Sequence, residues 1–159
     1  MRSNKINERN STIKMLTAPV NIMSSPGKQI ETYAMYDCGN TSSFITKSLL
    51  DKLNHSSSKT RKVNLNITTI NKHYQELPSY QVDGLIIKDH AENYTTCLLP
   101  VYTLSEIPAD DNDKTSSTEL QKLPHLRNID QTEIPAKIEV MFGCTCTYGA
   151  SKSQKITCR

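Results

Sequence analysis

The sequence predicts a small all-β domain with one short helix. Apolar side chains alternate with polar ones at Val63, Leu65 and Ile67, as in a half-buried strand. Only 36% of the 159 residues are hydrophobic, with no Trp and two Phe, which suits one small β-rich domain with polar loops. A core this lean also suits a protein whose partner completes it. The domain is expected at residues 15–149, between a polar basic tail at 1–14 and a basic tail at 150–159.

The expected elements follow from hydrophobic periodicity and turn residues. A hairpin is expected from two apolar strands, 16–23 and 29–36, joined by a turn rich in Ser, Pro and Gly. An amphipathic helix at 45–53 places its Ile and Leu residues on one face. The remaining expected strands are 63–67, 80–88 with a bulge or kink at Asp83-Gly84, 94–104 with an edge position implied by Pro100, and 138–143.

Composition also argues against several classes of protein. The net charge of +3 comes from scattered Lys and Arg that are not interleaved with aromatic residues, so no nucleic-acid partner is expected. No apolar run is long enough to cross a membrane, and the N-terminus has no signal-peptide core, so a cytoplasmic location is expected. Five cysteines without an export signal predict reduced thiols. No cofactor is expected.

The most informative stretch is the end of the second strand, where an apolar segment runs into Asp37. Gly39 follows two residues later, and a polar loop leads back to apolar chain at Phe44. This pattern places one carboxylate at the end of a buried strand, on a tight turn. Aspartic proteases use this arrangement, with apolar residues before Asp-Thr/Ser-Gly. An isolated Asp-x-Gly is also common in ordinary turns.

Hydrolysis of a peptide bond by carboxylates requires two of them. One is ionised and activates water, while the other is protonated and polarises the carbonyl group; such a pair shares one proton at mildly acidic pH. The chain has a single Asp-x-Gly motif. If the motif is catalytic, the second carboxylate must come from a second copy, and a two-fold axis between the copies creates the pair. A homodimer with a polypeptide substrate is therefore expected.

The order of the motifs resembles the aspartic peptidase domain of BEL/Pao-type retrotransposon polyproteins. In that family the first motif looks like Leu-Asp-Ser-Gly-Ser-x-x-Ser-Phe-Ile, which Asp37, Gly39 and Ser43-Phe44-Ile45 match. The family's Pro-x-Leu-x-x-Ile/Leu segment looks like the residues around Pro124, and its terminal Asp-Leu-Leu-Ile-Gly-Ala-Asp looks like residues 139–145. The likeness covers residues 16–148.

The resemblance implies a small closed retropepsin-like barrel with one short helix, dimeric, under a flap. It implies an endopeptidase that cleaves its own polyprotein. It assigns Asp37 as the catalytic residue. The catalytic loop would contain Cys38, Gly39, Asn40 and Ser43. The supporting strand would contain Met141, Phe142 and Gly143, and the flap Ile70, Asn71 and Lys72.

Departures from the family pattern leave a second interpretation open, a catalytically silent dimerisation or peptide-binding module on the same fold. Cys38 stands where the family has a Ser or Thr whose hydroxyl bonds across the dimer, and a thiol is a weaker donor. Asn40 stands where a small residue is usual, and Thr145 replaces an acid. The expected flap has no glycine at its tip.

The sequence does not favour three other chemistries. The acidic loop 105–121 lacks the mid-loop glycine and the final glutamate of a calcium-binding EF-hand loop. Cys144-x-Cys146 with Cys158 is a poor zinc chelate, so no metal is expected. A cysteine protease would pair Cys38 with a histidine, but no spacing supports any of the four: His55, His73, His90 and His125.

Overall fold

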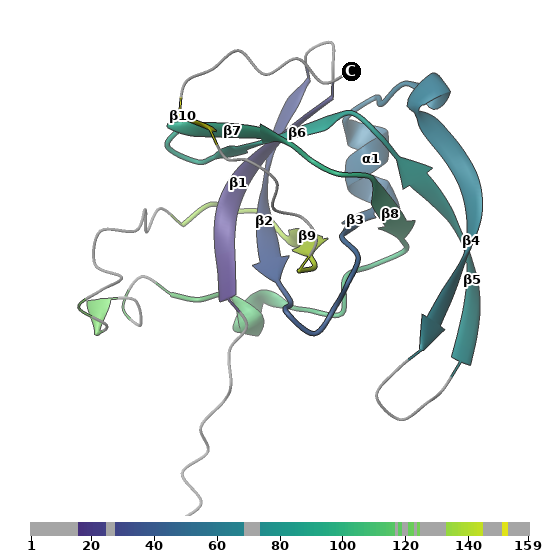
Figure 1. Cartoon of the computed structure of the whole chain (residues 1–159). Helices are drawn as coiled ribbons and strands as arrows, with labels where there is room; N and C mark the ends of the chain where they lie inside the picture. Colours follow the sequence, from purple (N-terminus) through teal and green to yellow (C-terminus); the bar gives the residue numbers. More distant parts are fainter. Residues whose placement is uncertain are drawn as a thin grey trace, which may run out of the picture.

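The computed structural model describes residues 16–24, 28–68, 74–116, 118, 121–122, 124, 133–144 and 151–152. The described chain is mostly β, with one short α-helix, as expected (Figure 1). The strands are β1 (Leu16–Ser24), β2 (Gln29–Tyr36), β3 (Phe44–Thr46), β4 (Thr60–Thr68), β5 (Tyr74–Val82), β6 (Leu85–Asp89), β7 (Tyr94–Cys97), β8 (Val101–Leu104), β9 (Ile138–Phe142) and β10 (Ser151–Lys152). The helices are α1 (Lys47–Lys52) and two 3-10 turns, η1 (Ser57–Lys59) and η2 (Asp111–Asp113).

All ten strands belong to one sheet with the order β10-β7-β6-β1-β2-β9-β3-β8-β5-β4. The order has two ends, so the sheet is open and the expected closed barrel is wrong for the described part of the chain. The physical reason lies in β5, which pairs with β4 along its whole length but with β8 only through Gln81 and Val82. The β4–β5 hairpin therefore projects from the body, and its outer edge does not return to β10 (Figure 1).

The centre of the sheet has an unusual order. β2 and β3 follow one another in sequence but do not pair, because β9 lies between them. β9 runs parallel to β2 and antiparallel to β3. A segment about a hundred residues downstream thus closes the gap beside the loop that leaves β2 at Asp37.

Several expected elements are confirmed, and two strands required correction. The first hairpin is confirmed, with Leu16 opposite Tyr36 and Met23 opposite Gln29. The strand expected at 80–88 is two strands, because Gly84 adopts a φ of +76° that ends one strand and starts another elsewhere in the sheet. The strand expected at 94–104 is also two, β7 and β8, and β8 is an interior strand between β3 and β5 rather than an edge.

The helix is shorter than its apolar pattern predicted. Residues 44–46 form β3, and Thr46 is the N-cap of α1, its side-chain oxygen accepting a hydrogen bond of 3.1 Å from the Leu49 amide. This bond satisfies one of the free amides of the first turn. Leu49 and Leu53 are buried, which confirms the inward face of the predicted helix.

The core has two clusters because both faces of β2 and β9 are covered. One cluster packs α1 against the sheet and contains Ile22, Ala34, Ile45, Leu49, Leu85 and Val140 among others. The other lies on the opposite face, against the segments before η2 and before β9, and contains Tyr33, Met35, Phe44, Ile107, Ile134, Ile138 and Met141. The strand that ends at Asp37 is therefore held from both sides.

The cysteines depart in part from the expectation of reduced thiols. Cys97 is disulfide-bonded. Cys38 and Cys144 are free and exposed. No helix in the described part of the chain is long and apolar enough to cross a membrane.

Stability should depend on pH through His55, whose Nδ1 lies 2.9 Å from the Ser24 hydroxyl. Burial lowers the pKa of His55 below its ordinary value of 6.5, and the Asp83 backbone opposes this only in part. Because the unfolded chain takes up the proton at a higher pH than the folded chain, stability should fall as the pH drops through about 6.5. Urea unfolding at pH 7.5 and 5.5 measures the difference in stability between the two pH values. This difference should be smaller in His55→Gln and unchanged in His90→Gln. An equal change in His55→Gln would contradict the assignment.

Candidate active site

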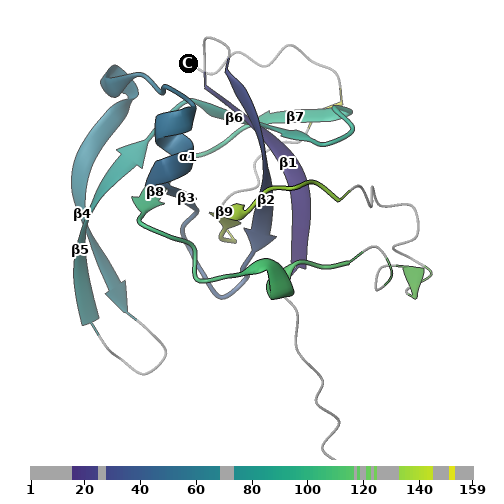
Figure 2. The same cartoon turned by 180° about the vertical axis from the view of Figure 1, so that it is seen from behind.

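Asp37 lies directly after β2, at the start of the loop that leads to β3. We call residues 37–43 the Asp37 loop. It lies at the same end of the molecule as the first residues of β1, and the β4–β5 hairpin extends toward this end too (Figures 1 and 2). The Asp37 loop spans the end of β9, because β9 fills the space between β2 and β3. Asp37 is half-buried, while Cys38 and Gly39 are exposed.

Three hydrogen bonds hold Asp37 in place. Its amide donates to the Phe142 carbonyl oxygen at 2.9 Å, which continues the pairing of β2 with β9 by one residue. Its carbonyl oxygen accepts from the Asn40 amide at 3.1 Å, which closes the turn. Its carboxylate oxygen Oδ1 accepts from the Gly39 amide at 2.9 Å. Backbone groups thus fix the position of the carboxylate at the molecular surface. None of these three hydrogen bonds involves a cationic side chain.

The end of β9 is joined to the Asp37 loop at two further points. The Gly143 amide donates to the buried Ser43 hydroxyl at 3.2 Å. The Cys144 amide donates to the Asn40 carbonyl oxygen at 2.8 Å. A Cβ atom on Gly143 would lie 2.5 Å from the Ser42 carbonyl oxygen and 2.7 Å from that of Asn40. Only glycine fits this approach, so the structure brings together the expected supporting strand and the expected catalytic loop.

The buried carboxylate of Glu139 was not predicted from the sequence. Glu139, on β9, accepts from the Thr46 hydroxyl at 3.1 Å and from Lys52 Nζ at 3.3 Å, and only 8% of it is exposed. Thr46 also caps α1, so one side chain ties the helix start to β9. The available signal was a glutamate inside an apolar strand together with a threonine directly before a helix.

The expected flap lies outside the described residues. Ile70, Asn71 and Lys72 fall between the described ends of β4 and β5. The two strands that lead to them are paired from Thr60 with Val82 to Thr68 with Tyr74. The described part of the hairpin points toward the end of the molecule that carries the Asp37 loop (Figures 1 and 2).

Three cavities in the described chain have volumes of about 670, 510 and 590 Å³. Asp37 lines none of them. The second is lined in part by Thr46, Lys52 and Glu139.

The alternative sites find little support in the contacts. Asp110 and Asp113 cap η2. Asp111 forms an ion pair with Lys114 at 2.7 Å, and the hydrogen bond and the charge of Lys114 lower the pKa of Asp111. The described residues hold no group of three or more side chains suited to a metal ion. Cys146 and Cys158 fall outside the description.

The described histidines do not pair with a thiol in the contacts of the structure. His55 contacts Ser24, and His90 lies 3.7 Å from Glu31. His73 and His125 lie outside the described residues.

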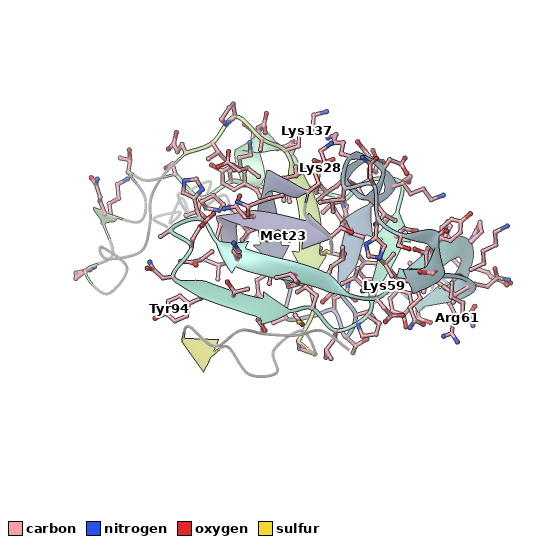
Figure 3. The ribbon with its side chains drawn as sticks, turned by 90° about the horizontal axis from the view of Figure 1, so that it is seen from above. Met23, Lys28, Lys59, Arg61, Tyr94 and Lys137 are labelled. Carbon is pink, nitrogen blue, oxygen red and sulfur yellow. The ribbon has the colours of Figure 1, made fainter. Side chains whose placement is uncertain are left out.

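Basic side chains come from separate elements. Lys59 and Arg61 project from η1 and the start of β4, whereas Lys28 and Lys137 precede β2 and β9 (Figure 3). This distribution is in line with the scattered positive charge of the sequence.

Comparisons with protein-family models, with curated proteins and with solved structures found no match for this chain.

Proposed function

We propose that this chain is one half of a symmetric aspartic endopeptidase, with Asp37 from each of two copies forming the catalytic pair. The observation that carries the proposal is the Asp37 loop: a strand-end carboxylate fixed by Gly39 and braced by the Phe142–Cys144 segment. The expected sequence motifs, a hundred residues apart, form one structural unit here. The lean composition and the resemblance to BEL/Pao-type peptidases support the same function.

The reaction needs one proton on the pair of carboxylates. The ionised carboxylate takes a proton from water, whose oxygen attacks the carbonyl carbon of the peptide. The protonated carboxylate donates a hydrogen bond to the carbonyl oxygen as negative charge develops there. The tetrahedral intermediate then collapses when the amine accepts a proton and leaves. The substrate class is an extended polypeptide, and the element's own polyprotein is the substrate that the resemblance suggests.

A silent dimerisation or peptide-binding module is the second candidate. The observation that favours it is the exposed thiol of Cys38, next to Asp37 in the sequence, where the peptidases that the chain resembles carry a hydroxyl. A thiol forms a weaker hydrogen bond than a hydroxyl, so the two loops would be held less firmly.

The test is cleavage of a peptide library between about pH 3 and 7, since a carboxylate pair is expected to work on the acidic side of neutrality. Wild type should show a bell-shaped pH profile. Asp37→Asn should show no cleavage, because the amide keeps the shape of the side chain but cannot accept the proton. Cys38→Ser should remain active, which distinguishes the aspartic mechanism from a cysteine nucleophile.

Two results would contradict the proposal. Cleavage at the wild-type rate in Asp37→Asn would exclude the aspartic mechanism. No cleavage by a wild-type chain that sedimentation shows to be a dimer would favour the silent module.

A further inference from the structure

A cavity of about 590 Å³ is lined by α1, by η1 and by the ends of β4 and β5 that lie away from the hairpin tip. Small-molecule sites typically measure about 300–1,000 Å³, so a compact organic ligand fits this volume. Asp37 does not line the cavity, and the inference below is therefore independent of the proposed peptidase activity. We call it the hairpin-root cavity. The lining residues that matter here are Lys47, Leu50, Asn54, Ser57, Lys62 and Tyr80.

The hairpin-root cavity carries an excess of positive charge. Lys47, from α1, and Lys62, from β4, both line it. Neither ammonium group forms an ion pair with a carboxylate in the described part of the chain. Asp51 also lines the cavity and offsets one of the two charges. An anion that enters this space would therefore be attracted by charge that the described chain leaves unpaired.

Both lysines border the same aromatic ring. Lys62 is the cross-strand partner of Tyr80, so their side chains are neighbours on one face of the β4–β5 hairpin. The Nζ atom of Lys47 lies 5.9 Å from the centre of the Tyr80 ring, within range of a cation–π contact. The backbone of Tyr80 is held in place because its amide donates to the hydroxyl oxygen of the buried Thr103 at 3.0 Å. The cavity thus has a fixed aromatic wall with positive charge beside it.

We propose that the hairpin-root cavity binds a small aromatic phosphate monoester, with the phosphate between Lys47 and Lys62 and the aromatic ring against Tyr80 and Leu50. A phosphate monoester carries a charge of about −1.5 to −2 at pH 7, which matches two ammonium groups better than the single charge of a carboxylate does. Asn54 and Ser57 line the same cavity, and their amide and hydroxyl groups can donate to phosphate oxygens. Leu50 and Tyr80 pack against the core, so the apolar wall is already formed before the ligand enters.

The test is a titration of the isotope-labelled full chain with phenyl phosphate at pH 7.5, followed by the NMR signals of the backbone amides. Phenyl phosphate should bind with a dissociation constant of about 1 mM or lower, a reasonable affinity for so small a ligand. The signals that move should belong to α1, η1 and the adjoining ends of β4 and β5. Inorganic phosphate, which lacks the ring, and phenol, which lacks the charge, should each bind at least about fivefold more weakly.

Three substitutions locate the two parts of the ligand. Lys47→Gln and Lys62→Gln should each weaken the binding of phenyl phosphate about fivefold to tenfold, because each removes one ammonium group from the phosphate. Tyr80→Leu should weaken it about threefold or more and leave the binding of inorganic phosphate unchanged. The matched control is Lys28→Gln, which removes the same charge from an exposed position before β2, outside the cavity (Figure 3). It should bind like wild type.

Several results would overturn the proposal. One is the absence of saturable binding up to about 10 mM phenyl phosphate, ten times the expected dissociation constant. An equal loss in Lys28→Gln and Lys47→Gln would mean that the net charge of the chain, and not the cavity, attracts the anion. Phenol that binds as tightly as phenyl phosphate would show an apolar site without a role for the lysines. Inorganic phosphate that binds as tightly as phenyl phosphate would remove the role of the ring.

Discussion

Peptide cleavage per wild-type chain should fall about tenfold when an excess of about ninefold of the Asp37→Asn chain is added. In a symmetric dimer each chain finds its partner at random, so only about a tenth of the wild-type chains would pair with another wild-type chain. Mixed dimers carry one carboxylate and one amide, and such a pair cannot supply both the base and the acid. The measurement is the initial rate at constant wild-type concentration, under conditions where sedimentation shows a dimer.

The control for this mixture is an equal excess of Asp51→Asn. Asp51 is exposed on α1, and its loss leaves the Asp37 loop intact, so cleavage should rise in proportion to the total chain. A rate that does not change with added Asp37→Asn would show that a single copy carries the whole active site. That result would exclude the half-site argument even if the chain proves to be a peptidase.

The sequence predicted the strands best where an apolar pattern and the flanking turn residues both indicate the same element. The hairpin before Asp37 was predictable because two apolar strands flank a turn rich in Ser, Pro and Gly, and its register follows from that turn. The strand at Ile138–Phe142 was predictable from its apolar run. That it lies beside the Asp37 loop came from the family resemblance, since strand order depends on long-range pairing that periodicity does not contain.

The errors came from positions where tertiary contacts override the local pattern. Asp83-Gly84 was expected as a bulge or kink inside one strand, but the positive φ of Gly84 divides the stretch, and the two parts pair in separate regions of the sheet. Pro100 indicated an edge strand, yet it lies between β7 and β8 and leaves β8 free to pair on both sides. The disulfide of Cys97 could not be predicted, because cysteine pairing depends on proximity in the fold.

Within the candidate site, the residues of the Asp37 loop were easier to predict than the buried contacts on β9. Asp37 and Gly39 stood out through their spacing, and Ser43 through the family resemblance. Glu139 did not, because a glutamate in an apolar strand is informative only once Thr46 and Lys52 are known to meet it. The second copy, which would supply the other carboxylate, is implied only by the need for two acids.

Gly143→Ala should destabilise the folded chain by about 2–4 kcal/mol. The added Cβ would lie 2.5 Å from the backbone oxygen of Ser42, so the Asp37 loop and the end of β9 must separate. Overpacking of this kind typically costs about 1–3 kcal/mol. Loss of the hydrogen bond from the Gly143 amide to Ser43 adds about 0.5–1.5 kcal/mol. Urea unfolding of wild type and variant measures the difference.

The matched substitution is Gly39→Ala, in the same loop but with a different neighbour. Its Cβ would lie 3.2 Å from Asp37 Oδ1, a side-chain atom that can move, so stability should change by no more than about 1 kcal/mol. The carboxylate would nevertheless shift from its bond with the Gly39 amide, and cleavage should fall by at least about tenfold, as misplaced catalytic groups do. Gly143→Ala with wild-type stability would show that β9 does not brace the loop. Gly39→Ala with full activity would show that the observed position of the carboxylate is not the working one.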